Sequence, residues 1–178
     1  MALLRRESRL KTACRWFVCR QVPRPSPRGW FGAPSTRTKA RVALLDVNAL
    51  VALAWDSHVH HGAVRAWFAA NSADGWATCP VTEAGFVRVC SNPKALPSAI
   101  AVEAARGVLS ALRDADGHRF LSNEVSLTDH DFPPIVGHRQ VTDAMLLTVA
   151  RREGIRLLTF DSGIAALAEG RDVELLTL

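Results

Sequence analysis

The chain has 178 residues, of which 48% are hydrophobic, and this is enough for one domain with a packed core. The formal charge of +5 at pH 7 is unevenly spread: residues 1–40 hold ten Lys and Arg against one acid, and residues 41–178 hold twelve against sixteen Asp and Glu. The second part therefore has a net charge of −4, so its overall charge gives no support for nucleic-acid binding.

No apolar run approaches the roughly 18 residues of a membrane span. The four cysteines show no C-x-x-C pair and no metal-ligand spacing, and Cys79, in an apolar stretch, is expected to be a small buried residue. These features favour a globular cytoplasmic protein with no membrane partner.

Residues 1–41 differ from the rest because they are rich in Pro, Arg, Ser and Thr, which predicts a disordered basic extension. Three origins are open: a basic arm that contacts nucleic acid, an organelle targeting segment, or a start codon assigned too early. The third is favoured, because a compact domain is predicted to begin at Val42 and a GTG codon there would be read as Met. The domain is therefore expected to span residues 42–178.

From residue 42 onward, short apolar runs alternate with segments of helical periodicity. The predicted elements are, in chain order, a strand at 42–46, helices near 48–55 and 59–70, a strand at 76–81, helices at 82–90 and 98–113, a strand at 118–122, a helix at 141–154, a strand at 155–161, a helix at 162–170 and a strand at 173–178. Thr82, Ser98 and Thr142 are predicted to begin their helices, and Gly154 is predicted to end one. The alternation predicts an α/β fold with three α/β/α layers and a mostly parallel central sheet.

Four acidic residues are predicted at the carboxyl ends of strands or at the helix starts that follow them: Asp46, Glu83, Asp143 and Asp161. Any one of them alone is explained as a helix cap or as a first-turn acid that complements the helix dipole. Four together repel one another unless a cation neutralises them. Carboxylate oxygens favour Mg²⁺ or Mn²⁺, so the pattern points to metal-dependent hydrolysis of phosphodiester bonds.

The segments that carry these acids resemble the PIN-domain ribonucleases, and within them the VapC-family toxins of toxin–antitoxin systems. The resemblance rests on LLDVNALVAL, TEAGFVRVCSNP, GHRQVTDAMLLTVAR and LLTFDSGI, which occur in that order within residues 42–178. It implies an endoribonuclease that uses Mg²⁺, with Mn²⁺ as an alternative. It also implies a cognate antitoxin, a homodimer and a toxin–antitoxin complex as partners.

By the same resemblance, Asp46, Glu83, Asp143 and Asp161 are the catalytic residues, and Asp46 and Asp143 are the firmest metal ligands. Glu83 would share a metal or orient the attacking water, and Asp161 would act directly or through water. Two other functions stay open. One is a PIN nuclease of RNA processing without an antitoxin, and the other is a PIN module that binds RNA or a partner without cleaving it.

Other polar residues flank the four acids. Asn48 is expected to hold Asp46 or contact phosphate, with a helix N-cap as its alternative, and Thr142 is expected to be a cap rather than a ligand. Arg88, His138 and Arg139 are candidates for contacting RNA phosphates, with a solvated surface role as their alternative.

The segment HVHH, residues 58–61, has three histidines, but their spacing does not place three ligands on one helical face. A structural or surface role is therefore expected for them. Trp67 and Phe68 are expected in the core or a dimer contact rather than as base-stacking platforms, and Trp55 is left open between these two roles.

Overall fold

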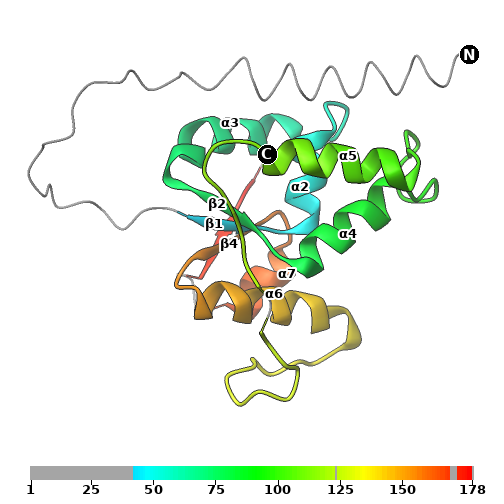
Figure 1. The fold of residues 1–178 in the computed structure, drawn as a ribbon. Coiled ribbons are helices and arrows are strands. Elements are labelled where there is room, and N and C mark those ends of the chain that lie inside the picture. Colours follow the sequence, from blue (N-terminus) through cyan, green and yellow to red (C-terminus); the bar gives the residue numbers. More distant parts are fainter. Residues whose placement is uncertain (1–41, 123, 169–171, 178) are drawn as a thin grey trace, which may run out of the picture.

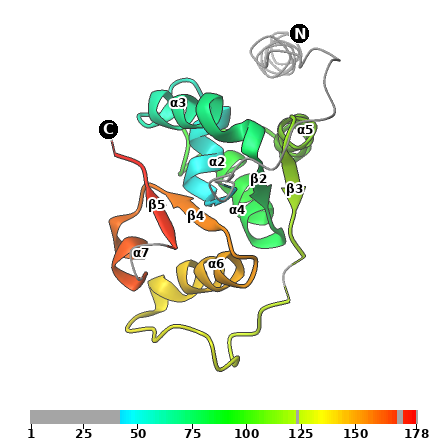
Figure 2. The same ribbon diagram turned by 90° about the vertical axis from the view of Figure 1, so that its left-hand side faces the viewer.

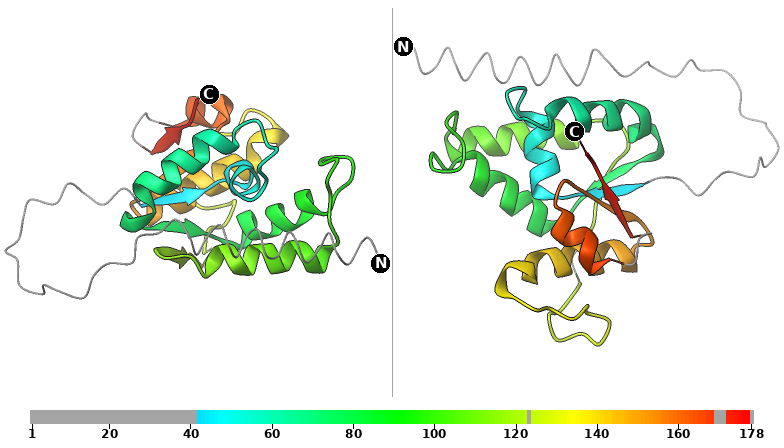
Figure 3. Two further views of the ribbon diagram at one scale, coloured as in Figure 1. Left: turned by 90° about the horizontal axis from the view of Figure 1, so that it is seen from above. Right: turned by 180° about the vertical axis from the view of Figure 1, so that it is seen from behind.

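The computed structural model describes residues 42–122, 124–168 and 172–177. Its centre is a five-stranded sheet in the order β3-β2-β1-β4-β5, in which every neighbouring pair is parallel (Figure 1). The strands are β1 (Ala43–Leu45), β2 (Trp76–Thr78), β3 (His118–Phe120), β4 (Arg156–Thr159) and β5 (Val173–Leu175). The sheet predicted as mostly parallel is thus parallel throughout the described strands, with β5, red in Figure 3, at one edge.

Helices cover both faces of the sheet, which gives the three layers predicted from the sequence (Figure 2). One face carries α2 (Val47–Ala54), α3 (His61–Asn71), α4 (Pro80–Cys90) and α5 (Val102–Arg113). The other carries α6 (Val141–Arg152) and α7 (Ser162–Leu167). Two short 3₁₀ helices, η1 (Ser72–Asp74) and η2 (His138–Gln140), precede β2 and α6.

The central strands are apolar throughout because both of their faces are buried. Side chains alternate between the faces: Ala43 and Leu45 pack with α2 and α4, whereas Leu44 packs with α6. All three are fully buried. This explains why β1 appears in the sequence as a continuous apolar run rather than as an alternating one.

Helices α2 and α4 pack closely because of a glycine. A Cβ atom at Gly85 would overlap the Val47 side chain, so only glycine allows this approach. The packing brings the start of α2, which follows β1, close to α4, which follows β2. Both helices therefore begin at the carboxyl edge of the sheet.

Two predicted helix starts are wrong because earlier residues begin the helices. β2 ends at Thr78 rather than at 81, and α4 begins at Pro80, whose fixed φ suits a first helical position. Thr82 is therefore not the cap; its hydroxyl accepts from the backbone N–H of Cys79, the N-cap residue, at 3.0 Å. Likewise Gln140 is the N-cap of α6, and Thr142 lies inside that helix.

The predicted helix at 98–113 begins later, at Val102, with Ala101 as its N-cap. Ser98 does not begin it, because its hydroxyl accepts a hydrogen bond from the indole N–H of Trp55 at 3.1 Å. Gly154 was predicted to end α6, and it does lie at the end of this helix: with φ +64°, it directly follows the C-cap residue Glu153.

Among the described residues, no helix has the length and apolar character needed to cross a lipid bilayer. Cys79 and Cys90 are buried free cysteines, as expected for Cys79. Trp55 and Trp67 are both buried in the core, which decides the open question for Trp55. The predictions for residues 1–41 lie outside the described residues.

Candidate active site

Asp46 and Asp161 follow two neighbouring strands, β1 and β4, at the carboxyl edge of the sheet. Asp46 is the N-cap of α2, and its carboxylate accepts from the backbone N–H of Val47 at 2.6 Å. Asp161 is the N-cap of α7 and accepts from the N–H of Gly163 at 2.7 Å. Asp46 and Asp161 therefore both act as helix caps, the role that explains a single acid at such a position. The cap hydrogen bond uses only one oxygen of each carboxylate, so the other oxygen can make further contacts.

A buried hydroxyl links these two acids. The Thr159 hydroxyl donates to Asp46 Oδ2 at 2.9 Å and accepts from the backbone N–H of Asp161 at 3.1 Å. Thr159 is fully buried and Asp46 is only 6% exposed. Burial raises the pKa of Asp46, the bonds from Thr159 and Val47 lower it, and the charge of Asp161 raises it. Asp46 is therefore a buried carboxylate that is held in one orientation.

Asp143 lies in the first turn of α6, on the opposite face of the sheet from α2. Partial burial, followed by the negative charges of Asp46 and Asp161, raises its pKa from 3.8 to about 6. Three acids from three separate segments thus interact at one edge of the sheet. We call Asp46, Asp143 and Asp161 the carboxylate cluster.

Glu83 lies in the first turn of α4 and has partners of its own. Its Oε1 accepts from the Thr78 hydroxyl at 2.7 Å, and its Oε2 lies 3.3 Å from Arg113 Nη1. His118 Nε2 lies 2.8 Å from the same Thr78 hydroxyl. Glu83 is thus held directly by Thr78 of β2 and Arg113 of α5, and His118 of β3 contacts the same Thr78 hydroxyl. The sequence pattern did not identify these three partners.

The other predicted site residues fall into two groups. Asn48 lies at the start of α2 and lines a pocket beside Asp161, and its alternative role as N-cap is wrong because Asp46 caps that helix. Arg88, His138, Arg139 and Thr142 are all exposed, on α4, η2 and α6. Their predicted contacts with RNA stay predictions.

The cluster is not a complete metal-ligand cage. Within the described ranges, no three His, Cys, Asp or Glu side chains are grouped closely enough to hold a metal ion by themselves. A cage is not needed for Mg²⁺, which usually takes one or two protein carboxylates and keeps several waters. The oxygen donors of the cluster, two of them with raised pKa values, therefore fit a hard divalent cation.

The sequence model of the PIN-domain family matches residues 43–170 of this chain. The chain belongs to the PIN-domain family. Ribonuclease VapC38 of Mycobacterium tuberculosis is 66% identical to it over 140 residues, which are 77% of this chain and 99% of the relative. Ribonuclease VapC39 of the same species is 43% identical over 137 residues, which are 75% of this chain and 99% of the relative.

A solved PIN-domain structure agrees with the fold. The crystal structure of Mycobacterium tuberculosis VapC20, a sarcin–ricin loop cleaving toxin, aligns with a TM-score of 0.52 at 16% identity. The alignment covers 76% of this chain and 99% of VapC20. This likeness confirms the predicted α/β/α architecture, and the family match and the VapC relatives confirm the predicted VapC-type PIN domain.

The PIN domain holds its cluster with residues that the sequence analysis missed. Thr159 was a detectable candidate, because it is a polar residue within the apolar run LLTF that leads to Asp161. Arg113 and His118 gave no such signal, since a basic residue at a helix end and a histidine in an edge strand are ordinary surface features. His118 reaches Glu83 only through the Thr78 hydroxyl, which depends on β3 pairing with β2, and Arg113 reaches it from the end of α5.

The raised pKa of Asp143 predicts a pH-dependent effect of Asp143→Asn on stability. The carboxyl is harder to ionise when folded than when unfolded, so wild-type stability declines as pH rises from about 3.8 through about 6. At pH 8 in EDTA, the asparagine variant is expected to be more stable by about 1 kcal/mol, a value reduced for solvent screening. Urea denaturation should show this gain shrinking toward zero near pH 4. A variant less stable than wild type at pH 8 would contradict the repulsion.

Proposed function

We propose that this PIN-domain protein is a metal-dependent endoribonuclease that acts as the toxin of a toxin–antitoxin pair. The observation that carries the proposal is the convergence of Asp46, Asp143 and Asp161 at one sheet edge, where burial and the neighbouring carboxylates raise the pKa values of Asp46 and Asp143. The relatives named ribonuclease VapC, at up to 66% identity over most of the chain, support the same reaction.

The proposed cofactor is Mg²⁺, with Mn²⁺ as an alternative. Asp46 and Asp143 would hold it, and Asp161 would contact it directly or through water. When bound, a divalent cation lowers the pKa of water and neutralises charge on a phosphate and its leaving oxygen. The interaction of the three carboxylates supports this choice, because a cation removes their mutual repulsion.

The chain's own groups would orient the reactants. Thr159 fixes the Asp46 carboxylate, so the oxygen facing the cluster is held before any ligand arrives. Glu83, held by Thr78 and Arg113, would orient the attacking water rather than supply a main ligand. Hydrolysis would leave a 3′-hydroxyl and a 5′-phosphate.

Exposed side chains on α4, η2 and α6 would bind the RNA backbone. Arg88, His138 and Arg139 offer donors for phosphate oxygens, and Thr142 offers a hydroxyl at the start of α6. The net negative charge of the domain makes such local donors necessary, because the overall charge does not attract RNA.

We also propose a cognate antitoxin, a homodimer and a cytoplasmic location. The family relationship supports the antitoxin, and a small DNA-binding protein encoded immediately upstream would support it further. Neutralisation of growth arrest on co-expression tests the pairing, and a nuclease that no neighbouring gene product inhibits would instead be a PIN enzyme of RNA processing.

The reaction is tested by incubating the purified full chain with cellular RNA and Mg²⁺ and then mapping new 5′ ends. Discrete ends that carry a 5′-phosphate are the expected result. RNA that is bound but never cut, under any divalent cation, would instead favour the non-catalytic binding module.

A further inference from the structure

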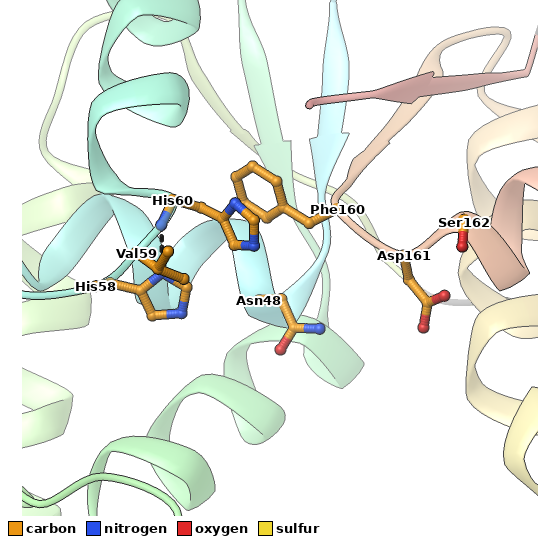
Figure 4. A pocket seen from close by; sticks show the side chains of 7 residues that line it. All are labelled: Asn48, His58, Val59, His60, Phe160, Asp161 and Ser162. Carbon is orange, nitrogen blue, oxygen red and sulfur yellow. Dashed lines mark hydrogen bonds between the residues drawn. The ribbon is translucent and has the colours of Figure 1, made fainter. Parts of the chain in front are cut away.

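A pocket of about 420 Å³ lies beside the carboxylate cluster and has no assigned role (Figure 4). Three segments form it: the start of α2, the turn between α2 and α3, and the junction of β4 with α7. Its lining residues are Asn48, His58, Val59, His60, Phe160, Asp161 and Ser162. The volume is within the range of pockets that hold small organic ligands.

One side of the pocket is a stack of flat rings. The His60 ring lies parallel to the Phe160 ring, with centroids 4.1 Å apart and an angle of 14° between the planes. The His58 ring lies on the far side of His60, with centroids 5.7 Å apart. The histidines predicted to be structural or surface groups thus form part of a pocket wall, in which Phe160, directly after β4, packs against His60.

The hydrogen bonds fix which atoms face a ligand. The backbone N–H of His60 donates to His58 Nδ1 at 3.2 Å, so a neutral His58 carries its proton on Nε2. Burial, followed by the neighbouring His60 and His61, lowers the pKa of His58 and favours this neutral form. Figure 4 shows that the second ring nitrogen of His58 faces the same space as the Asn48 amide.

Several polar groups of the pocket lack partners. Within residues 42–122, 124–168 and 172–177, no protein group pairs with the Asn48 amide or the Ser162 hydroxyl, both of which are exposed to solvent, and His60 Nδ1 is buried without a partner. The exposed groups can exchange water for a ligand, whereas a buried nitrogen without a partner, such as His60 Nδ1, is unusual. The pocket therefore has unused donors and acceptors next to flat aromatic surface.

The charge of the lining decides the kind of ligand. None of the seven residues is Lys or Arg, and one, Asp161, is an acid, so a phosphate would be repelled. A neutral planar group with polar edges fits better. Proteins read single-stranded RNA in this way, by stacking bases on aromatic rings and by hydrogen bonds from side-chain amides to base edges.

We propose that this pocket binds the base of a nucleotide next to the scissile phosphate and thereby selects the RNA that is cut. This inference rests on the proposed ribonuclease function, because Asp161 belongs to both the pocket and the cluster. Contact with the His58 and His60 rings would supply affinity, and the Asn48 amide and His58 Nε2 would distinguish the base.

Binding of free ribonucleosides tests the pocket without any cleavage step. The wild-type full chain in EDTA is titrated with adenosine, cytidine, guanosine and uridine while the histidine ring signals are followed by NMR. At least one nucleoside is expected to shift the His58 and His60 signals and leave the exposed His130 unchanged. His60→Ala should weaken that binding about 10-fold, whereas His130→Ala should not.

Other outcomes would overturn the inference. A response to inorganic phosphate but to no nucleoside would show a phosphate site, and a response to neither would show that the pocket takes no nucleotide. Nucleoside binding in a protein that never cuts RNA would contradict the proposed function while supporting a base pocket.

Cleavage of a random single-stranded RNA library gives a second readout. Wild type is expected to prefer one base at a position flanking the cut, and Asn48→Ala and His58→Phe are expected to reduce that preference about 10-fold. His58→Phe retains a flat ring and removes only the ring nitrogens, so it tests the reading of the base edge separately from ring contact. An unchanged preference in both variants would overturn the inference even if RNA is still cut.

Discussion

Asp143→Asn is expected to reduce RNA cleavage by at least about 100-fold while the domain remains folded. Loss of a group that only orients a metal ligand costs about 10- to 100-fold in affinity or activity, and loss of a ligand should cost at least as much. The asparagine keeps the shape of the side chain but cannot supply a negative oxygen. Initial rates on a defined single-stranded RNA at saturating Mg²⁺, with circular dichroism for the fold, measure the effect.

A matched control separates position from chemistry. Asp74 is an exposed acid in η1, before β2, and so lies at the opposite edge of the sheet from the cluster. Asp74→Asn makes the same change in charge and should leave the rate within about twofold, because surface substitutions remote from a site have small effects. A folded Asp143→Asn protein that cuts RNA as fast as the control would disprove the role of Asp143.

Removal of divalent metal is expected to abolish cleavage, and added Mg²⁺ or Mn²⁺ is expected to restore it. Without a cation, partial burial and then the charges of Asp46 and Asp161 raise the pKa of Asp143 to about 6. The three carboxylates then repel one another and also an RNA phosphate. Activity before and after EDTA, followed by titration with each metal, measures the dependence. EDTA already saturated with Mg²⁺ controls for effects of the chelator itself.

The stability of the folded protein tests metal binding without any RNA. A cation that binds the folded cluster at 100 times its dissociation constant should stabilise wild type by about 2.7 kcal/mol, and Asp143→Asn by much less. Cleavage that continues unchanged in EDTA, together with a melting temperature indifferent to Mg²⁺, would rule out the metal site.

Local pattern predicted the elements well where burial dictates the residue types. The apolar run of β1 and the caps and glycine around α6 correspond to real element ends or lie within two residues of them. Thr82 and Thr142 were misplaced by local effects, because Pro80 and Gln140 begin their helices earlier, whereas the error at Ser98 came from a nonlocal contact. Ser98 resembles a helix start, but its hydroxyl pairs with Trp55, which lies 43 positions earlier.

The candidate site was predictable in part for the same reason. Asp46 and Asp161 stand out because a charge directly after a buried strand has few local explanations, and both lie where expected at the carboxyl edge. Thr159 was missed because its role depends on Asp46, 113 positions away. The sequence pattern was used to ask only whether His58 and His60 could bind a metal from one helix. Their place in a pocket wall depends on Phe160, which packs against His60 from a distant part of the chain.

By itself, the sequence of this PIN-domain protein determined which segments become buried strands and which acids follow them. Those properties depend on apolar runs and on neighbouring residues, so they are encoded locally. Only the tertiary structure decided that β4 pairs with β1 and that β2 separates β1 from β3. Hydrogen bonds between parallel strands join backbones far apart in the chain, and no local pattern specifies the partner. That pairing joins Asp46 to Asp161 through Thr159, whereas the packing of α4 with α5 places Glu83 against Arg113.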